Sequence, residues 1–378
     1  MTIKPDVNVK RSRLWYLLPI FLGVIGGIAT YFYLRASDPT LAKSSLWLGI
    51  ILSAVVSVSA LSIYIVYLRD ITAAREQISS GNVIDTAQFG PVEYADVGQG
   101  APILAIHGTG GGFDQGLLTA KSFMGDHITD THRVIAPSRF GYLKTPMPSG
   151  DDDRSPAAQA DAHAALLDAL GIKEKVTVIG ASAGALSAAE FAAKYPDRVS
   201  VLVLTVPAAW SPDAAASEDS AEIGSNDFIM NTVLRSDFMM WVVTKLAGDQ
   251  MISFLGVPSE LQQSMTPKER ENTERLIQMI QPVSQRYEGI KQDAENHQNR
   301  QWVALEQITA PTIIVDAKDV VTYPGSKYTA ENIPNAKLVE FETGGHLLIG
   351  HGDDAVAAIR QFMQEHESTA LMARNTDG

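Results

Sequence analysis

Two long hydrophobic runs stand at the start of this chain. Leu14–Leu34 and Leu46–Leu68 contain no charged residue, and each is about as long as the apolar core of a bilayer requires. The first run is too long for the apolar part of a signal peptide. Aromatic residues lie near the ends of both runs, as they do at membrane–water interfaces: Trp15, Tyr16, Tyr31, Tyr33, Trp47, Tyr64 and Tyr67. The pattern predicts two transmembrane helices within residues 14–68, packed closely at Gly23, Gly26 and Gly27.

The lysine and arginine residues around these runs predict the orientation. They are more numerous before the first run than in the connecting loop or after the second run: Lys4, Lys10, Arg11 and Arg13, then Arg35 and Lys43, then Arg69 and Arg75. Basic residues gather on the cytoplasmic side of membranes, so the N-terminus is predicted inside. Two crossings return the chain to the same side. We therefore expect a protein of a bacterial inner membrane in which the chain beyond the second run lies in the cytoplasm.

After a short polar helix near Asp70–Ser80, short apolar runs alternate with stretches of helical period. Two extended runs flank the turn at Gly98–Gly100, and a loose tail is expected after Ser368. The other expected strands are 102–106, 131–138, 175–182, 198–208, 311–317 and 337–343, and the expected helices are 156–170, 185–194 and 353–366. This alternation is typical of an α/β fold, in which helices flank a mostly parallel sheet.

Residues 210–305 interrupt the alternation, because they show helical periods and little strand character. We predict a helical insertion at 210–305 in a core formed by 86–209 and 306–367. Within the insertion, Phe238–Val243 forms either part of its own core or the wall of an apolar pocket.

The composition narrows the possible functions. The net charge of −13 argues against a nucleic-acid-binding surface, and the absence of cysteine excludes disulfides, thiolate metal sites and a cysteine nucleophile. The eight histidines are scattered and form no H-E-x-x-H motif, so we expect neither a metal nor a cofactor.

A lone serine lies where a predicted strand turns into a helix, in the sequence Gly180-Ala181-Ser182-Ala183-Gly184. Such a turn is crowded, and small residues on both sides allow it to expose the serine hydroxyl. The amides at the start of the helix can stabilise a developing oxyanion. The pattern indicates Ser182 as a nucleophile and the Ala183 amide as an oxyanion donor, although a glycine turn before a helix can also serve packing alone.

A second glycine-rich segment, "ILAIHGTGGG", follows another predicted buried strand. Its spacing matches neither of the common phosphate-binding loops. The backbone at Thr109 is accessible enough to supply the second oxyanion donor. His107 is expected to be structural and to bond the backbone at the end of the strand.

A general base and an acid are expected after the serine. "TGGHLLIGH" offers His346 and His351 beyond a strand, and "VDAKD" offers Asp316 and Asp319 at the end of another. A serine hydrolase needs a histidine to take the hydroxyl proton and a carboxylate to orient that histidine.

These motifs together resemble the serine hydrolase branch of the α/β-hydrolase superfamily. The resemblance extends over Phe89–His366 and rests on "HGTGGG", "GASAG", the strand-end aspartates and "GGH" in this order. It implies a catalytic triad of Ser182, Asp319 and His346, and a lid formed by the insertion. The acid pattern departs from that of the family, which usually has Gly at the position of Ala317. Dehalogenases and epoxide hydrolases of this fold have an aspartate nucleophile, so they are excluded.

The sequence thus predicts a membrane-anchored serine hydrolase that cleaves a carboxylic ester or related acyl bond of a small molecule, lipophilic substrates included. Two alternatives stay open. One is a non-catalytic module of the same fold that binds a ligand or partner, and the other is a carbon–carbon bond hydrolase.

Overall fold

A computed structural model describes residues 11–150, 153–209, 211, 229–298 and 303–376. The chain divides into two compact units, Met1–Thr72 and Ala73–Gly378. Of the basic residues that predict the membrane orientation, Lys4 and Lys10 lie outside the described residues.

The first unit is formed by two apolar helices that are long enough to cross a membrane by length and composition. A 3₁₀ turn η1 (Arg13–Tyr16) leads into α1 (Leu17–Leu34), and α2 (Pro39–Ser79) follows. A Cβ on Gly49 would lie 2.4 Å from Gly23 O, and one on Gly27 would lie 3.0 Å from Ser45 O. The predicted close approach at the α1 glycines is therefore confirmed.

The residues near Asp70–Ser80 are helical as expected, but they form the end of α2, which runs without a break from Pro39 to Ser79, and not a short helix of their own. The sequence contains neither glycine nor proline from Ile50 to Ser79, so nothing ends the helix at the polar boundary. Its start is also earlier than expected, since Asp38 Oδ1 accepts the amide of Leu41 at 3.0 Å and caps it.

The second unit is built on an eight-stranded sheet with the order β1-β2-β4-β3-β5-β6-β7-β8. The strands β3 to β8 run parallel to one another, whereas β2 pairs antiparallel with both β1 and β4. Their bounds are β1 Asn82–Thr86, β2 Gly90–Val97, β3 Ala101–Ile106, β4 His132–Pro137, β5 Val176–Ala181, β6 Val199–Thr205, β7 Thr312–Ala317 and β8 Lys337–Phe341. The register pairs Ile106 with Gly180, so β3 and β5 end side by side.

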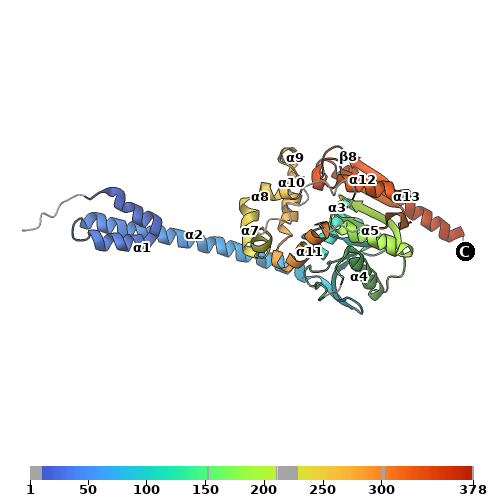
Figure 1. Ribbon diagram of the computed structural model, residues 1–378, viewed down its shortest axis with the longest axis horizontal. Helices are drawn as coiled ribbons and strands as arrows, with labels where there is room; N and C mark the ends of the chain where they lie inside the picture. The colour runs from blue at the N-terminus through green and yellow to red at the C-terminus, as the bar shows by residue number, and fades with distance from the viewer. Residues whose placement is uncertain (1–10, 151–152, 210, 212–228, 299–302, 377–378) are drawn as a thin grey trace, which may run out of the picture. The chain divides into compact units, whose positions relative to one another are not determined.

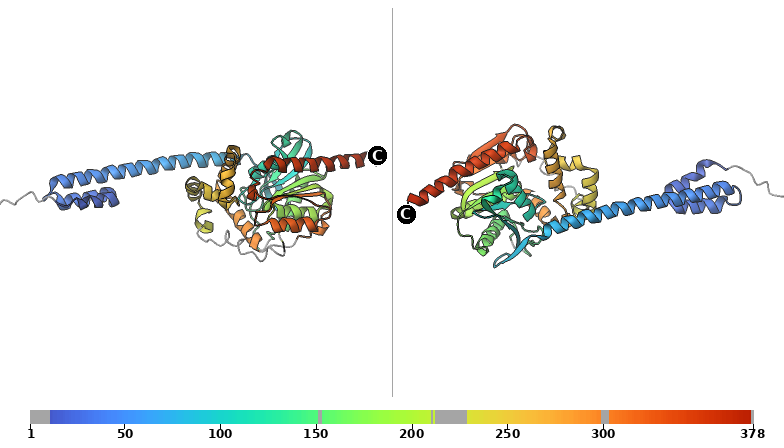
Figure 2. Two further views of the ribbon diagram at one scale, coloured as in Figure 1. Left: turned by 90° about the horizontal axis from the view of Figure 1, so that it is seen from above. Right: turned by 180° about the vertical axis from the view of Figure 1, so that it is seen from behind.

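Helices cover both faces of this sheet (Figures 1 and 2). On one face, α4 (Pro156–Ala169), α5 (Gly184–Lys194) and α12 (Tyr323–Asn332) enclose a core that includes Leu104 and Ile106. On the other, α3 (Phe113–Met124) and α13 (Gly352–Thr376) enclose a core with Ile103 and Ala105. Successive residues of β3 thus alternate between two cores, as a strand buried on both faces requires. The predicted fold class is confirmed.

Three local expectations fail. The extended run before Gly98 is two strands, because Thr86 Oγ1 accepts the amide of Phe89 and starts a turn. The structure also contains two helices, α3 and α12, that the sequence pattern does not predict. The loose tail after Ser368 is wrong, since α13 continues to Thr376 through residues of high helix propensity such as Ala370 and Leu371.

The described residues between β6 and β7 form helices and turns. They comprise η6 Ile229–Val233, α7 Asp237–Leu246, α8 Gly248–Phe254, α9 Ser259–Ser264, α10 Pro267–Gln278, η7 Val283–Gln285, α11 Tyr287–Gln298 and η8 Leu305–Gln307. Local signals fix several starts: Ser236 caps α7, and Thr266 with Glu269 forms a capping box on α10. Within the predicted insertion 210–305, residues 210, 212–228 and 299–302 lie outside the described residues.

Short 3₁₀ turns complete the unit: η2 Ile128–Asp130, η3 Pro196–Arg198 and η9 Gly345–Leu347. The last of these contains the histidine that the sequence indicates as the base.

Candidate active site

Ser182 lies in the tight turn between β5 and α5. Its φ of +51° is a conformation that few residues other than glycine adopt, so the turn is strained. The Ser182 amide donates to Thr205 O at 3.0 Å, and the Ala208 amide donates to Ser182 O at 3.0 Å. The end of β6 and the segment after it thus hold the turn, and the serine lines a cavity.

The glycines on either side of Ser182 allow a close backbone approach. A Cβ on Gly180 would lie 2.6 Å from Ala188 Cβ, and one on Gly184 would lie 2.3 Å from His107 O. Since real side chains do not tolerate such distances, α5 can begin against the end of β3 only with glycine at these positions. The expectation that the turn needs small residues is confirmed.

The glycine-rich loop after β3 lies beside Ser182. A Cβ on Gly108 would be 3.1 Å from Ser182 Cβ. Both predicted oxyanion residues, Thr109 and Ala183, line the same cavity as Ser182. The next amides of the loop are engaged inside the protein, because Gly110 N donates to Tyr142 Oη at 3.2 Å and Gly111 N to Gly108 O at 3.3 Å. Thr109 lies directly before these engaged amides and stays the predicted second oxyanion donor.

His107 is a structural histidine, as expected. Its Nε2 accepts the Arg139 amide at 3.0 Å, and its Nδ1 lies 2.7 Å from Gly108 O. Burial and the nearby Arg139 guanidinium hold the pKa of His107 well below its usual value, so the ring is neutral. The Nε2 atom is the acceptor, hence Nδ1 bears the proton and donates to Gly108 O.

His346 lies opposite the serine, with its Nε2 at 2.9 Å from Ser182 Oγ. The insertion helps to place it, because Gly256 O accepts the His346 amide at 3.0 Å. Burial lowers the pKa of His346 to about 4, so the imidazole is neutral near pH 7 and can accept a proton. The alternative His351 stacks on Phe341 instead.

Asp319 lies next to the histidine loop without an ion pair to the imidazole among the described residues. Its two carboxylate oxygens accept the amides of Gly344 and Gly345 at 3.2 and 3.0 Å. These amides directly precede His346, and Asp319 and His346 line the same cavity. The structure thus brings Ser182 and His346 together and brings Asp319 to the backbone of the histidine loop.

Asp316 occupies a different environment. Its carboxylate is fully buried and accepts the Ser326 hydroxyl at 2.5 Å and the Ala317 amide at 2.8 Å. Burial raises its pKa to about 6. These bonds tie the end of β7 to α12.

A cavity of about 1770 Å³ contains Ser182, His346 and Thr109 in its walls. The insertion supplies much of its apolar lining: Ile229, Met230, Val233, Leu234, Met240, Val243, Met251, Phe254, Leu255, Ile280 and Ile290. Met240 also belongs to a buried cluster within the insertion. Both interpretations of the Phe238–Val243 segment thus hold, since one residue serves the insertion core and the cavity wall together.

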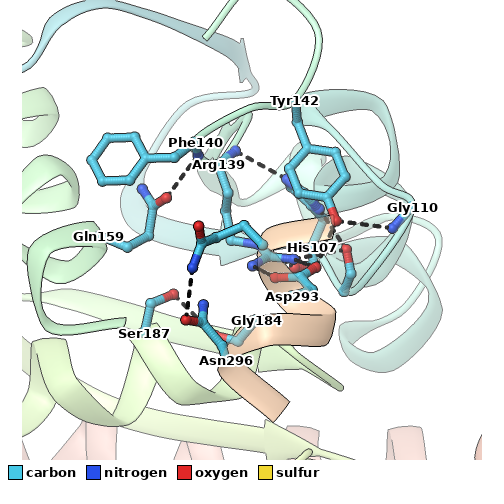
Figure 3. A network of polar contacts seen from close by, with 12 residues as sticks. His107, Gly110, Arg139, Phe140, Tyr142, Gln159, Gly184, Ser187, Asp293 and Asn296 are labelled. Carbon is cyan, nitrogen blue, oxygen red and sulfur yellow. Dashed lines mark hydrogen bonds and ion pairs between the residues drawn. The ribbon is translucent and has the colours of Figure 1, made fainter. Parts of the chain in front are cut away.

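A buried polar network that is not evident in the sequence lies beneath the oxyanion loop (Figure 3). Arg139, which follows β4, forms a bidentate ion pair with Asp293 of α11, both contacts being 2.6 Å. Tyr142 Oη donates to Asp293 Oδ2 at 2.5 Å. The charged groups are at most 7% exposed, so loss of either partner is expected to cost about 3–5 kcal/mol of folding free energy.

A second buried ion pair reaches the same loop from the insertion. Arg286 is fully buried and contacts Asp114 of α3 at 2.9 Å, while its Nη1 donates to Gly111 O at 2.5 Å. A positional signal could have revealed the first pair, because Arg139 directly follows a strand that ends at the same edge of the sheet as β3. The residues near Arg139 in the sequence do not indicate that Asp293 is its partner.

Similarity to known proteins identifies the family of this chain. A profile of the alpha/beta hydrolase fold matches residues 101–353. The chain belongs to the α/β-hydrolase fold family. The match contains the serine turn, the oxyanion loop, both aspartates and both histidines considered above.

Curated relatives of this family member differ in their reactions. The chain is 25% identical over 306 residues to the cis-3-alkyl-4-alkyloxetan-2-one decarboxylase of Shewanella oneidensis, covering 76% of this chain and 89% of the relative. It is 26% identical to lipase 1 of Psychrobacter immobilis, covering 67% and 74%. It is 27% identical to the 2-hydroxymuconate semialdehyde hydrolase of Pseudomonas putida, covering 72% and 90%. Together they support a hydrolase of this fold family.

A solved structure supports the fold. An α/β-hydrolase fold protein from Nakamurella multipartita superposes with a TM-score of 0.59 at 26% identity, covering 75% of this chain and 98% of that one. The two N-terminal apolar helices lie outside residues 101–353, which the family profile matches.

Proposed function

We propose that this protein is a membrane-anchored serine hydrolase that cleaves a carboxylic ester or a related acyl bond. The observation that carries the proposal is the 2.9 Å contact between Ser182 Oγ and His346 Nε2 at the wall of a large, mainly apolar cavity. A nucleophile and a neutral base in hydrogen-bond contact are the minimum that acyl transfer needs. The similarity to lipase 1 of Psychrobacter immobilis agrees with an ester substrate.

In the proposed mechanism, His346 Nε2 takes the proton of Ser182 Oγ while the oxygen attacks the acyl carbon. The negative charge that develops on the carbonyl oxygen is stabilised by the amides of Thr109 and Ala183. Protonated His346 then donates its proton to the departing alcohol oxygen, which leaves an acyl-serine. Water attacks this intermediate after losing a proton to His346, and Ser182 recovers its proton as the acid is released.

Labelling with a fluorophosphonate tests the proposal directly. The full-length protein in detergent is expected to become covalently modified at Ser182 and to hydrolyse p-nitrophenyl esters. Peptide mass mapping identifies the labelled residue. A folded protein that neither reacts with the probe nor hydrolyses any ester of a chain-length series would contradict a serine hydrolase and favour a ligand-binding module.

The anchor and its orientation belong to the same proposal. The two apolar helices and the basic residues before the first one support a two-pass anchor with the catalytic unit in the cytoplasm of a bacterium. The protein is expected to stay in the membrane pellet after carbonate extraction and to resist protease added to intact spheroplasts. Digestion of the region beyond Asp70 without lysis would instead place the catalytic unit outside.

A further inference from the structure

The oxyanion loop is fixed from behind by the side chains of His107 and Arg139, which do not line the cavity that contains Ser182, whereas Asp293 does line it. Three donors converge on one carbonyl, Gly108 O: His107 Nδ1 at 2.7 Å, Arg139 Nη2 at 3.1 Å and the Gly111 amide at 3.3 Å. This carbonyl belongs to the same peptide group as the Thr109 N–H. Because a trans peptide is planar, the direction of the carbonyl also fixes the direction of that N–H.

The next peptide is fixed by a different member of the network. Gly110 N donates to Tyr142 Oη at 3.2 Å, and Tyr142 Oη donates to Asp293. Gly110 has a φ of +78°, so the chain can turn sharply directly after this second peptide. Both peptides that flank the Thr109 Cα are therefore held by side chains of the network.

Asp293 ties these contacts to the insertion. It lies on α11 and accepts three bonds, two from Arg139 and one from Tyr142. Arg139 also contacts the loop directly: its Nε donates to His107 O at 3.0 Å. Figure 3 shows Asp293 beneath Tyr142, close to His107 and the loop.

We propose that Arg139, held by Asp293 of the insertion, is a positioning residue that directs the Thr109 amide towards the oxyanion. The inference rests on the proposed function. The guanidinium has a second effect, because a cation at the carbonyl end of a peptide withdraws electrons and makes its N–H a stronger donor. The insertion therefore takes part in building the oxyanion hole in addition to lining the cavity.

The test compares two buried ion pairs on one loop. Arg139→Lys keeps the charge but cannot contact Asp293, His107 O and Gly108 O together, and Asp293→Asn removes the charge that orients Arg139. Arg286→Lys and Asp114→Asn are the matched controls. Arg286 is equally buried and donates to Gly111 O, which belongs to a peptide that does not include the Thr109 N–H.

The measurements are kcat and KM for an ester and the inhibition constant of a trifluoromethyl ketone, which forms a tetrahedral oxyanion on the serine. Removal of a whole oxyanion donor costs about 10²–10³ in kcat, so misdirection of one is expected to cost about 10–100-fold. In both test variants kcat should fall by this factor with KM nearly unchanged, and the ketone should bind more weakly in proportion. The control variants should keep kcat and ketone inhibition within about threefold of the wild type.

Equal losses in the test and control variants, or unchanged ketone inhibition in the test variants, would overturn the inference. If Arg139→Lys and Asp293→Asn do not fold, Tyr142→Phe decides, because it removes the acceptor of the Gly110 amide and one donor to Asp293 but keeps the Arg139–Asp293 ion pair. A loss of at least fivefold in kcat supports the inference, and unchanged kcat overturns it. Failure of the proposed function is distinguishable, since the wild-type protein would then show neither labelling nor hydrolysis.

Discussion

Replacing Ser182 with alanine is expected to abolish ester hydrolysis almost completely. Loss of the nucleophile in a serine hydrolase lowers kcat by about 10⁶, and we expect a decrease of about five to six orders of magnitude here. The fold should survive, because Ser182 is held in its turn by backbone bonds to Thr205 and Ala208 that alanine also forms. Steady-state hydrolysis of p-nitrophenyl esters by the purified full-length variant measures the effect, and covalent fluorophosphonate labelling should disappear with it.

Ser187→Ala provides a matched control on the same helix. Its hydroxyl is buried, donates to Gly184 O at 3.3 Å and lies 3.3 Å from His163 Nε2. It does not line the cavity. This variant loses a serine hydroxyl as Ser182→Ala does, yet it should keep kcat within a few-fold of the wild type. Near-normal hydrolysis by a folded Ser182→Ala protein would contradict the assignment of the nucleophile.

The features that the sequence predicts well depend on residues near one another in the chain. Ser182 and Ala183 could be located because the strand, the two glycines and the helix start all fall between Val176 and Lys194. Thr109 could be located in the same way, from a glycine run that directly follows β3. In such segments the backbone conformation needed for the chemistry is encoded by the residues that adopt it.

The two missed helices contain residues that usually argue against helix. Gly116 lies within α3, and a Cβ at this position would be 2.7 Å from Ala105 O, so glycine is needed for the helix to pack on β3. Gly325 lies in the first turn of α12 and approaches Ala209 O in the same manner, at 2.2 Å from an added Cβ. Tertiary packing requires glycine at these positions, and glycine has a low helix propensity. The sequence around them therefore does not predict a helix.

The network beneath the oxyanion loop could not be predicted because its partners are far apart in the chain. Arg139 and Asp293 are separated by 154 positions. From the sequence alone, each charged side chain is expected to be exposed to solvent. Only the packing of α11 against the loop after β4 brings their charges together away from water. The acid of the proposed triad presents a related difficulty, since Asp316 and Asp319 are both plausible from the chain and differ only in their three-dimensional surroundings.

Asp319→Asn is expected to lower kcat by about three to four orders of magnitude, whereas Asp316→Asn should change it less than tenfold. An asparagine in place of the triad acid costs about 10⁴ in kcat, because the imidazolium formed during catalysis loses its counter-charge. Asp319 is next to His346 through the amides of Gly344 and Gly345, and catalytic hydrogen bonds often tighten only once substrate is bound. Asp316 is committed to Ser326. Steady-state kinetics of the two folded variants measures the difference.

The pH dependence of kcat/KM gives a second, independent test of the acid. Burial alone lowers the pKa of His346 to about 4, and a carboxylate that approaches the ring favours the protonated form and raises that pKa. The base is active only when neutral, so activity is lost as the pH falls through the pKa of His346. Removal of the Asp319 charge should therefore move the acid limb to lower pH, while Asp316→Asn leaves the limb in place. If Asp316→Asn shifts the limb and Asp319→Asn does not, Asp316 is the orienting acid and the assignment of Asp319 is wrong.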